Sequence, residues 1–205
     1  MCSALKVAKR SGRTVQDLDM LDDLAIPGAI VPKRRWLTPA EFVALVGALV
    51  GALIPHRADW VRVAVWTGGR KEEVSGLLWT DVDLDAGVLH IRGTKGRRHD
   101  RNASDRYIPI GADFRAWLEA RPVRSGPLVR YWHNPEPMLA DRCAKLGMPV
   151  CTPHDFRRTF ASWLKQRGVD SMIVAKMLGH TSSALVDQVY GQLDMAAMKR
   201  ALGLP

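Results

Sequence analysis

The feature that most constrains this chain is a helix start followed at once by an unbroken apolar run. Thr38-Pro39-Ala40-Glu41 is a capping box with proline at the first helical position, where the Thr hydroxyl accepts a helix amide and the Glu side chain reaches back. The run from Phe42 to Ile54 has 13 residues, fewer than the roughly 17–25 needed to span a bilayer. We therefore expect a buried helix at the opening of a compact domain, and no membrane segment.

Strand signals occur in one region only, whereas apolar spacing and cap residues predict helices along the rest of the domain. Val82–Leu84 and Val88–Ile91 flank the turn Asp85-Ala86-Gly87, and Arg106–Ile110 supplies a third short strand. The expected fold class is α+β, a mainly α-helical domain with a small three-stranded antiparallel sheet. Besides the apolar run, helices are expected over residues 58–66, 71–78, 112–120, 136–146, 154–167, 171–178, 184–190 and 195–202.

Residues 1–35 differ in character from residues 36–205. Residues 4–12 resemble the end of a helix that stops at Gly12, and Pro27-Gly28 and Pro32–Arg35 are typical of a linker. No apolar segment of the kind found in secretory signals follows the early basic residues, so we expect a cytoplasmic protein. We expect residues 1–35 to be an N-terminal linker and residues 36–205 to be the compact domain.

Charge points to a polyanionic partner. Thirty basic residues against 21 acidic ones leave a formal net charge of +9, and 21 of the bases are arginine, whose planar fork suits phosphate. Nucleic acid is the leading candidate for that partner, and solubility alone is the competing explanation.

Several kinds of site are missing from the sequence. It has no phosphate-binding G-x-x-x-x-G-K-[ST] loop, no H-E-x-x-H and no G-x-S-x-G. The six histidines never fall at metal-ligand spacing, and the three cysteines form no C-x-x-C pair. We expect no metal and no cofactor.

Basic residues gather in two places early in the domain. Thr67-Gly68-Gly69-Arg70 is a glycine turn that places an arginine at a helix start, where exposed amides favour an anion. A segment between two expected strands holds six bases, and a solvated loop and a phosphate-contacting loop explain it equally well. These bases are Arg92, Lys95, Arg97, Arg98, Arg101 and Arg106.

Three further features lie in the last third of the chain. His154 and Arg157 are three residues apart at the start of a helix capped by Thr152, so they share a face and form a good anion clamp. Gly179 ends a helix and presents His180, and Tyr190 follows ten residues later. Each feature by itself has an ordinary structural explanation.

The order of these features resembles the tyrosine recombinase (phage integrase) family. The segment from Thr67 to Asp83 resembles that family's first arginine box, the segment from Pro153 to Leu164 resembles its second, and Leu178-Gly179-His180 through Tyr190 resembles its closing segment. The resemblance covers residues 36–205.

Carried over residue by residue, the resemblance implies a DNA breaking-and-rejoining reaction that needs no metal and no ATP. Tyr190 is implied as the nucleophile that forms a 3′-phosphotyrosyl link, and Lys95 as the group that protonates the leaving 5′-oxygen. The remaining implied roles are phosphate clamping by Arg70 and Arg157, proton transfer by His154, a phosphate hydrogen bond from His180 and support of Arg70 by Glu73. Further DNA contacts are expected from Arg92, Arg97, Arg98, Arg101, Arg106 and Arg158.

The resemblance also implies partners. These are double-stranded DNA and other copies of the chain, assembled as a tetramer on paired sites, with a C-terminal tail that docks either on a neighbouring protomer or within its own chain. Residues 4–12 resemble the end of the last helix of the family's core-binding domain, and the rest of that domain is missing from this sequence. Because a clamp around duplex DNA needs both domains, this chain alone is expected to bind DNA weakly. A phage or mobile-element integrase is the main hypothesis. A Xer-type resolvase, a type IB topoisomerase and a non-catalytic DNA-binding regulator are the alternatives.

Overall fold

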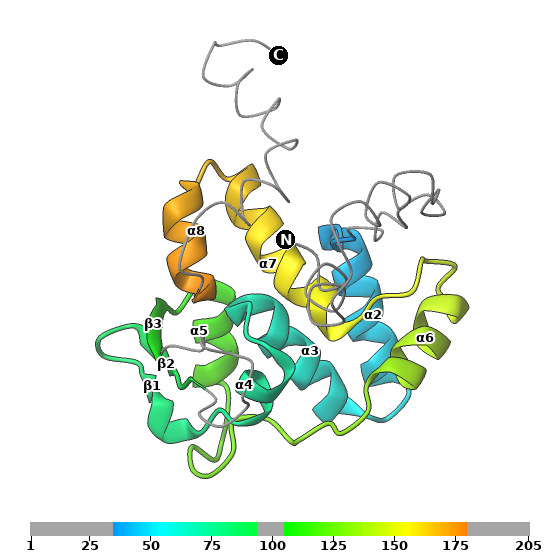
Figure 1. Ribbon diagram of the computed structural model, residues 1–205. Helices are drawn as coiled ribbons and strands as arrows, with labels where there is room; N and C mark the ends of the chain where they lie inside the picture. The colour runs from blue at the N-terminus through cyan, green and yellow to red at the C-terminus, as the bar shows by residue number, and fades with distance from the viewer. Residues whose placement is uncertain (1–34, 94–104, 180–205) are drawn as a thin grey trace, which may run out of the picture. The chain divides into compact units, whose positions relative to one another are not determined.

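The computed structural model describes residues 35–93 and 105–179, all of which belong to one of the two units into which the chain divides, residues 34–205. The expected mixture of helices with one small antiparallel sheet is confirmed (Figure 1). The helices are α2 (Pro39–Gly51), α3 (Pro55–Thr67), α4 (Lys71–Ser75), the 3-10 helix η3 (Trp79–Asp81), α5 (Ala112–Glu119), α6 (Glu136–Lys145), α7 (Pro153–Gln166) and α8 (Ser171–Leu178). The strands are β1 (Val82–Asp83), β2 (Val88–Ile91) and β3 (Arg106–Pro109).

Helix α2 begins with the expected capping box. The Glu41 amide donates to the Thr38 hydroxyl over 3.2 Å, and the Thr38 amide donates to Glu41 Oε2 over 2.8 Å. The helix ends at Gly51, three residues before the end of the apolar run. Leu53 has a φ of 57°, which is incompatible with a right-handed helix, and Pro55 then opens α3.

Helix α3 lies at the centre of the core. It packs against α2, α4 and α7, and Figure 1 shows it between α2 and the sheet side of the molecule. Trp60 is fully buried and meets the rings of Trp132 and Phe156 edge to face. Because α4 follows α3 after a three-residue turn and α7 packs against α3, α3 fixes the distance between the two expected arginine boxes.

The sheet places an arginine on its inner face. Strand β2 pairs antiparallel with β1 and β3, and Leu89 lies opposite Ile108. Side chains alternate between faces along a strand, so Arg106 lies on the same buried face as Ile108, while Tyr107 points outward.

Helix α4 is shorter than the expected helix over residues 71–78. Residues 77–79 instead pair with a distant segment: the Leu128 amide donates to the Leu77 carbonyl, and the Trp79 amide donates to the Gly126 carbonyl. These long-range bonds satisfy backbone groups that a longer helix would have paired locally.

Some expectations concern residues that the structure does not describe. The helices over residues 184–190 and 195–202 and the linker before residue 35 lie outside the described ranges. Within residues 35–93 and 105–179, no helix has the length and apolar character that crossing a membrane requires.

Candidate active site

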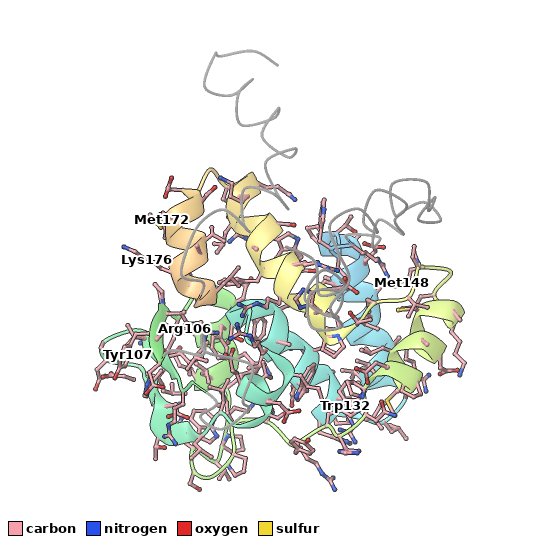
Figure 2. All side chains as sticks on the ribbon, viewed as in Figure 1. Arg106, Tyr107, Trp132, Met148, Met172 and Lys176 are labelled. Carbon is pink, nitrogen blue, oxygen red and sulfur yellow. The ribbon has the colours of Figure 1, made fainter. Side chains whose placement is uncertain are left out.

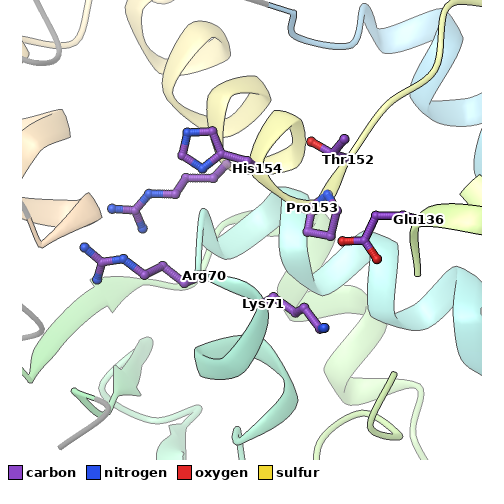
Figure 3. Close-up of a pocket in the computed structure, with 7 residues that line it drawn as sticks. Arg70, Lys71, Glu136, Thr152, Pro153 and His154 are labelled. Carbon is purple, nitrogen blue, oxygen red and sulfur yellow. The ribbon is translucent and has the colours of Figure 1, made fainter. Parts of the chain in front are cut away.

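A cavity of about 480 Å³ opens where α4 and α7 begin. Figure 3 shows Arg70 and His154 at this cavity, with Lys71 and Glu136 on its other side. Its lining therefore combines residues from both expected arginine boxes. The lining residues are Arg70, Lys71, Glu136, Thr152, Pro153, His154 and Arg157.

Arg70 is held at the cavity by a turn that only glycine tolerates well. Gly68 ends α3 in the left-handed region, with φ of 61°, and a Cβ there would overlap the ring of Phe160. The chain then reverses into α4, whose N-cap residue is Arg70. The backbone amide and the guanidinium of Arg70 both donate to Glu73, over 2.8 and 3.0 Å.

Glu73 is a fully buried carboxylate that accepts four hydrogen bonds. Besides the two from Arg70, its oxygens receive two from the guanidinium of Arg106, over 2.7 and 3.2 Å. Burial by itself raises the pKa of Glu73, but the hydrogen bonds and charge of Arg106, followed by those of Arg70, outweigh burial and lower the pKa to about 2. Glu73 is therefore an anion at any pH near neutrality, and its position supports Arg70.

Arg157 joins three helices. Its side chain is buried and donates to the Gly68 carbonyl at the end of α3 over 2.7 Å and to the Leu178 carbonyl at the end of α8. Cations at helix C-termini interact favourably with the helix dipole and satisfy carbonyls that lack an intrahelical partner. This places a positive charge at the cavity with little freedom to rotate away.

His154 lies in the first turn of α7 among cationic neighbours. Partial desolvation, then the positive charges of Arg158 and Arg157, lower the pKa of His154, while Asp155 opposes the shift. Asp155 is itself committed to other groups, since it accepts hydrogen bonds from Thr152 and pairs with Arg158 over 2.9 Å. The imidazole of His154 is therefore mainly neutral at pH 7 and can accept a proton.

The other expected DNA-contacting bases fall into three groups. Arg92 is half exposed and pairs with the buried carboxylate of Asp81, and Arg158 is partly exposed beside Asp155. Arg106 differs from its expected role as an exposed DNA contact, because all three guanidinium nitrogens donate to Glu73 and to the Met177 carbonyl inside the protein. The remaining expected site residues, Lys95, Arg97, Arg98, Arg101, His180 and Tyr190, lie outside the described ranges.

Two lining residues were not singled out from the sequence. Lys71 directly follows Arg70 and donates its ammonium to the His133 carbonyl, and Glu136 opens α6 next to Pro135. The adjacency of Lys71 to Arg70 was an available signal, whereas nothing local to Glu136 indicates that α6 reaches this cavity.

The cavity can bind a tetrahedral anion and move a proton. Two guanidinium groups favour an anion bound beside them, and a neutral imidazole can take up a proton. Among the described residues, no group of three or more His, Cys, Asp or Glu side chains is placed to hold a metal ion.

Comparisons with known proteins show which family this chain resembles. A family model described as the phage integrase family matches residues 134–197. The tyrosine recombinase XerA of Thermococcus kodakarensis is 32% identical over 152 residues, which are 65% of this chain and 50% of that protein. Over the residues that they cover, both matches support the tyrosine recombinase family for this chain.

Other tyrosine recombinases and integrases show a similar relationship. Prophage integrase IntF of Escherichia coli is 24% identical over 71% of this chain and 33% of its own length. The chain spans about half the length of XerA and of the XerD protein from Chlorobaculum tepidum that it also matches.

Solved structures share the tyrosine recombinase fold. The catalytic domain of bacteriophage HP1 integrase matches with a TM-score of 0.61 at 18% identity, over 82% of this chain and 94% of that one. The Tn1549 transposon integrase in complex with transposon right end DNA matches with a TM-score of 0.65 at 17% identity, over 94% and 81%. At these identities the likeness concerns the fold, and it agrees with the mainly helical architecture expected from the sequence.

Proposed function

We propose that this chain carries the catalytic part of a site-specific DNA recombinase that acts in integration or excision of phage or mobile-element DNA. The observation that carries the proposal is the cavity where Arg70, Arg157 and His154 meet, in a chain whose matches support the tyrosine recombinase family. The proposal includes a cytoplasmic location, where such DNA is available.

In the proposed reaction the phenol oxygen of Tyr190 attacks a phosphorus atom of the DNA backbone. The bond from phosphorus to the 5′-oxygen breaks, leaving a 3′-phosphotyrosyl ester and a 5′-hydroxyl. Lys95 supplies the proton that the 5′-oxygen gains, and His154 takes up the proton that the phenol loses. A second 5′-hydroxyl reverses these steps on the new strand, so one ester replaces another and no external energy source is needed.

Arg70 and Arg157 bind the non-bridging oxygens in this proposal, and His180 adds a hydrogen bond. Phosphoryl transfer gathers negative charge on those oxygens, so fixed cations supply much of the catalysis. The ion pair of Arg70 with the buried Glu73 carboxylate and the two carbonyl contacts of Arg157 support this role, because both guanidinium groups are held before substrate binds.

The proposed partners are double-stranded DNA and further copies of the chain, as a tetramer on paired sites with a tail docked between protomers. The excess of 30 basic over 21 acidic residues supports binding to a polyanion. Solved relatives support the choice of DNA, since the Tn1549 integrase and XerH are described as complexes with their DNA substrates.

The decisive experiment uses suicide duplexes of randomised sequence, each nicked so that cleavage releases a short fragment and traps the protein. We expect a covalent protein–DNA adduct that survives detergent, with mass spectrometry locating the DNA on Tyr190. Tyr190→Phe is the matched control and forms no adduct. Equal adduct from both proteins contradicts the nucleophile assignment, and absence of adduct from the wild type favours a non-catalytic regulator.

The variant Arg70→Ala distinguishes a role of Arg70 in catalysis from a role in binding the DNA duplex. Because Arg70 is expected to stabilise charge that develops only during transfer, its loss lowers the rate of adduct formation by about 10²–10³-fold, while duplex affinity changes far less. Gel-shift titration and adduct kinetics on the same duplex measure the two effects. Equal losses in both assays make Arg70 a docking contact.

A Xer-type resolvase is the second candidate, favoured by the 32% identity to XerA. A resolvase recombines two copies of one site, whereas an integrase joins two different sites, so the sites recovered from the trapped adducts distinguish them. Relaxation of a supercoiled plasmid that carries no recombination site indicates the type IB topoisomerase activity instead.

A further inference from the structure

Arg106 is a buried arginine that does not line the active-site cavity. Figure 2 shows it between β3 and the lower end of α8. Its side chain is only 6% exposed, so it is removed from any surface that meets DNA. A buried guanidinium is costly unless all its donors are used, and here the partners are specific.

The contacts of Arg106 connect two parts of the site. Its two terminal nitrogens donate to the two oxygens of Glu73, and its Nε donates to the Met177 carbonyl over 2.8 Å. The aliphatic part of the side chain lies against Gly179, where a Cβ would come within 3.2 Å of Arg106 Cδ. Through these hydrogen bonds, Arg106 connects the Glu73 carboxylate to the last turn of α8.

The same carboxylate holds Arg70. Oε1 of Glu73 accepts from the guanidinium of Arg70, and Oε2 accepts from its backbone amide, so a rotation of the carboxylate displaces both groups. Among the described residues, the charged groups that face Glu73 are Arg70 at the start of α4 and Arg106 of β3, and α8 contributes only the Met177 carbonyl to this cluster.

We propose that Arg106 is a positioning residue: by occupying the Glu73 carboxylate and tying it to α8, it fixes the guanidinium of Arg70 at the cavity without touching DNA. The inference rests on the proposed function for its catalytic readout. It replaces the expectation that Arg106 is one of several DNA-contacting bases.

The test compares Arg106→Gln, Arg106→Lys, Glu73→Gln and the double variant Arg106→Gln/Glu73→Gln in the full chain. Arg115→Gln is the control for loss of an arginine, since Arg115 is exposed and pairs only with Glu119 and the Leu84 carbonyl among described groups. We expect Arg106→Gln to slow adduct formation at least tenfold while duplex affinity stays within twofold. Arg106→Lys recovers part of the rate, because lysine restores the charge but not the two-pronged contact.

Two further measurements distinguish a positioning role of Arg106 from a general disturbance of the structure by the substitution. Loss of Arg106 leaves Glu73 buried with one cation, so the pKa of Glu73 rises. On the acid side, the rate of Arg106→Gln is therefore expected to fall at a higher pH than the rate of the wild type, in which protonation of His154 limits the reaction. The double variant is expected to be no slower than the slower single variant. Additive losses, or a loss of affinity that matches the loss of rate, overturn the proposal and make Arg106 an independent DNA contact.

An NMR measurement keeps the inference testable if the wild type forms no adduct. The side-chain Nε–H resonance of Arg70, assigned by its disappearance in Arg70→Lys, is expected to shift or broaden in Arg106→Gln and to remain in place in Arg115→Gln. An unchanged Arg70 resonance in a folded Arg106→Gln or Arg106→Lys protein overturns the inference. Absence of adduct with a shifted resonance rejects the proposed function but supports the positioning role.

Discussion

Among single residues, Glu73 links stability to pH. Its pKa of about 2 in the folded chain lies below the value of 4.5 for a free carboxyl, so ionised Glu73 favours folding. A carboxyl whose pKa is lower in the folded chain than in the unfolded chain stabilises the folded chain fully at pH values above its unfolded pKa. This stabilisation is lost as the pH falls through the folded pKa.

We expect the free energy of unfolding of the wild type to fall relative to that of Glu73→Gln between about pH 5 and pH 2. The pH-dependent difference amounts to about 3 kcal/mol, because each unit of pKa shift corresponds to about 1.4 kcal/mol. Urea unfolding of both proteins at a series of pH values measures it. Parallel stability curves across this window contradict the assignment.

His154 is expected to titrate below the usual histidine range. Its partial desolvation is fixed by the position of α7, but the charge of Arg158 can be removed, so Arg158→Gln raises the pKa of His154. A ¹H–¹³C NMR titration of the imidazole follows this change. Arg124→Gln removes an exposed arginine that donates to the Glu119 carbonyl and serves as the control. A pKa of His154 at or above 6.5 in the wild type contradicts the electrostatic description.

At the scale of residues, the sequence predicts side-chain positions where local spacing determines geometry. His154 and Arg157 share the first turns of α7, and the glycine turn places Arg70 at a helix start. The burial of Arg106 was not predicted, because its position in a basic stretch suggests exposure. The register of β2 and β3 puts Arg106 on the inner face, and that register is a long-range property.

At the scale of elements, the turn from α3 to α4 depends on Gly68. Alanine there incurs a left-handed backbone cost of about 1–2 kcal/mol and overlaps the ring of Phe160. Gly87 has a similar φ of 68°, but no atom lies within 4 Å of the position that an alanine methyl would take, so Gly87→Ala measures the backbone cost alone. We expect Gly68→Ala to lower the free energy of unfolding by more than Gly87→Ala does. Equal losses in urea unfolding show that Phe160 moves away without cost.

The helices were largely predictable because their starts carry local signals. Proline stands at the first position of α2 and α7, and Asp170 caps α8 with hydrogen bonds to two helix amides. Helix α3 also starts with a proline, Pro55, but its start was expected later, at residue 58. The end of α4 was not predictable, because Leu77 and Leu78 leave the helix to pair with residues 126–128. A local pattern holds no information about that partner.

For the molecule as a whole, the reactivity of two buried cysteines can measure how often the core unfolds. Cys143 and Cys151 are fully buried with their sulfur atoms 3.5 Å apart, and burial together with Cys143 raises the pKa of Cys151. Both belong to the main apolar core cluster. A thiol reagent therefore reaches them when the core opens.

We expect both thiols, in a Cys2→Ser background, to react with DTNB at the rate of global unfolding and to accelerate with urea as unfolding does. Ala144→Cys adds an exposed thiol next to Cys143 and reacts at once. Reaction of the native pair as fast as that exposed thiol indicates a local opening between α6 and α7.

Because Arg157 contacts two helix ends, a substitution at this position also changes the structure around the cavity. One guanidinium closes the ends of α3 and α8 at the point where it also faces the cavity. A lysine in its place can reach one carbonyl but not both, so even a charge-preserving exchange detaches a helix end. In the proposed reaction Arg157 also binds the phosphate, so the inactivity of an Arg157 variant would combine a structural loss with a catalytic one.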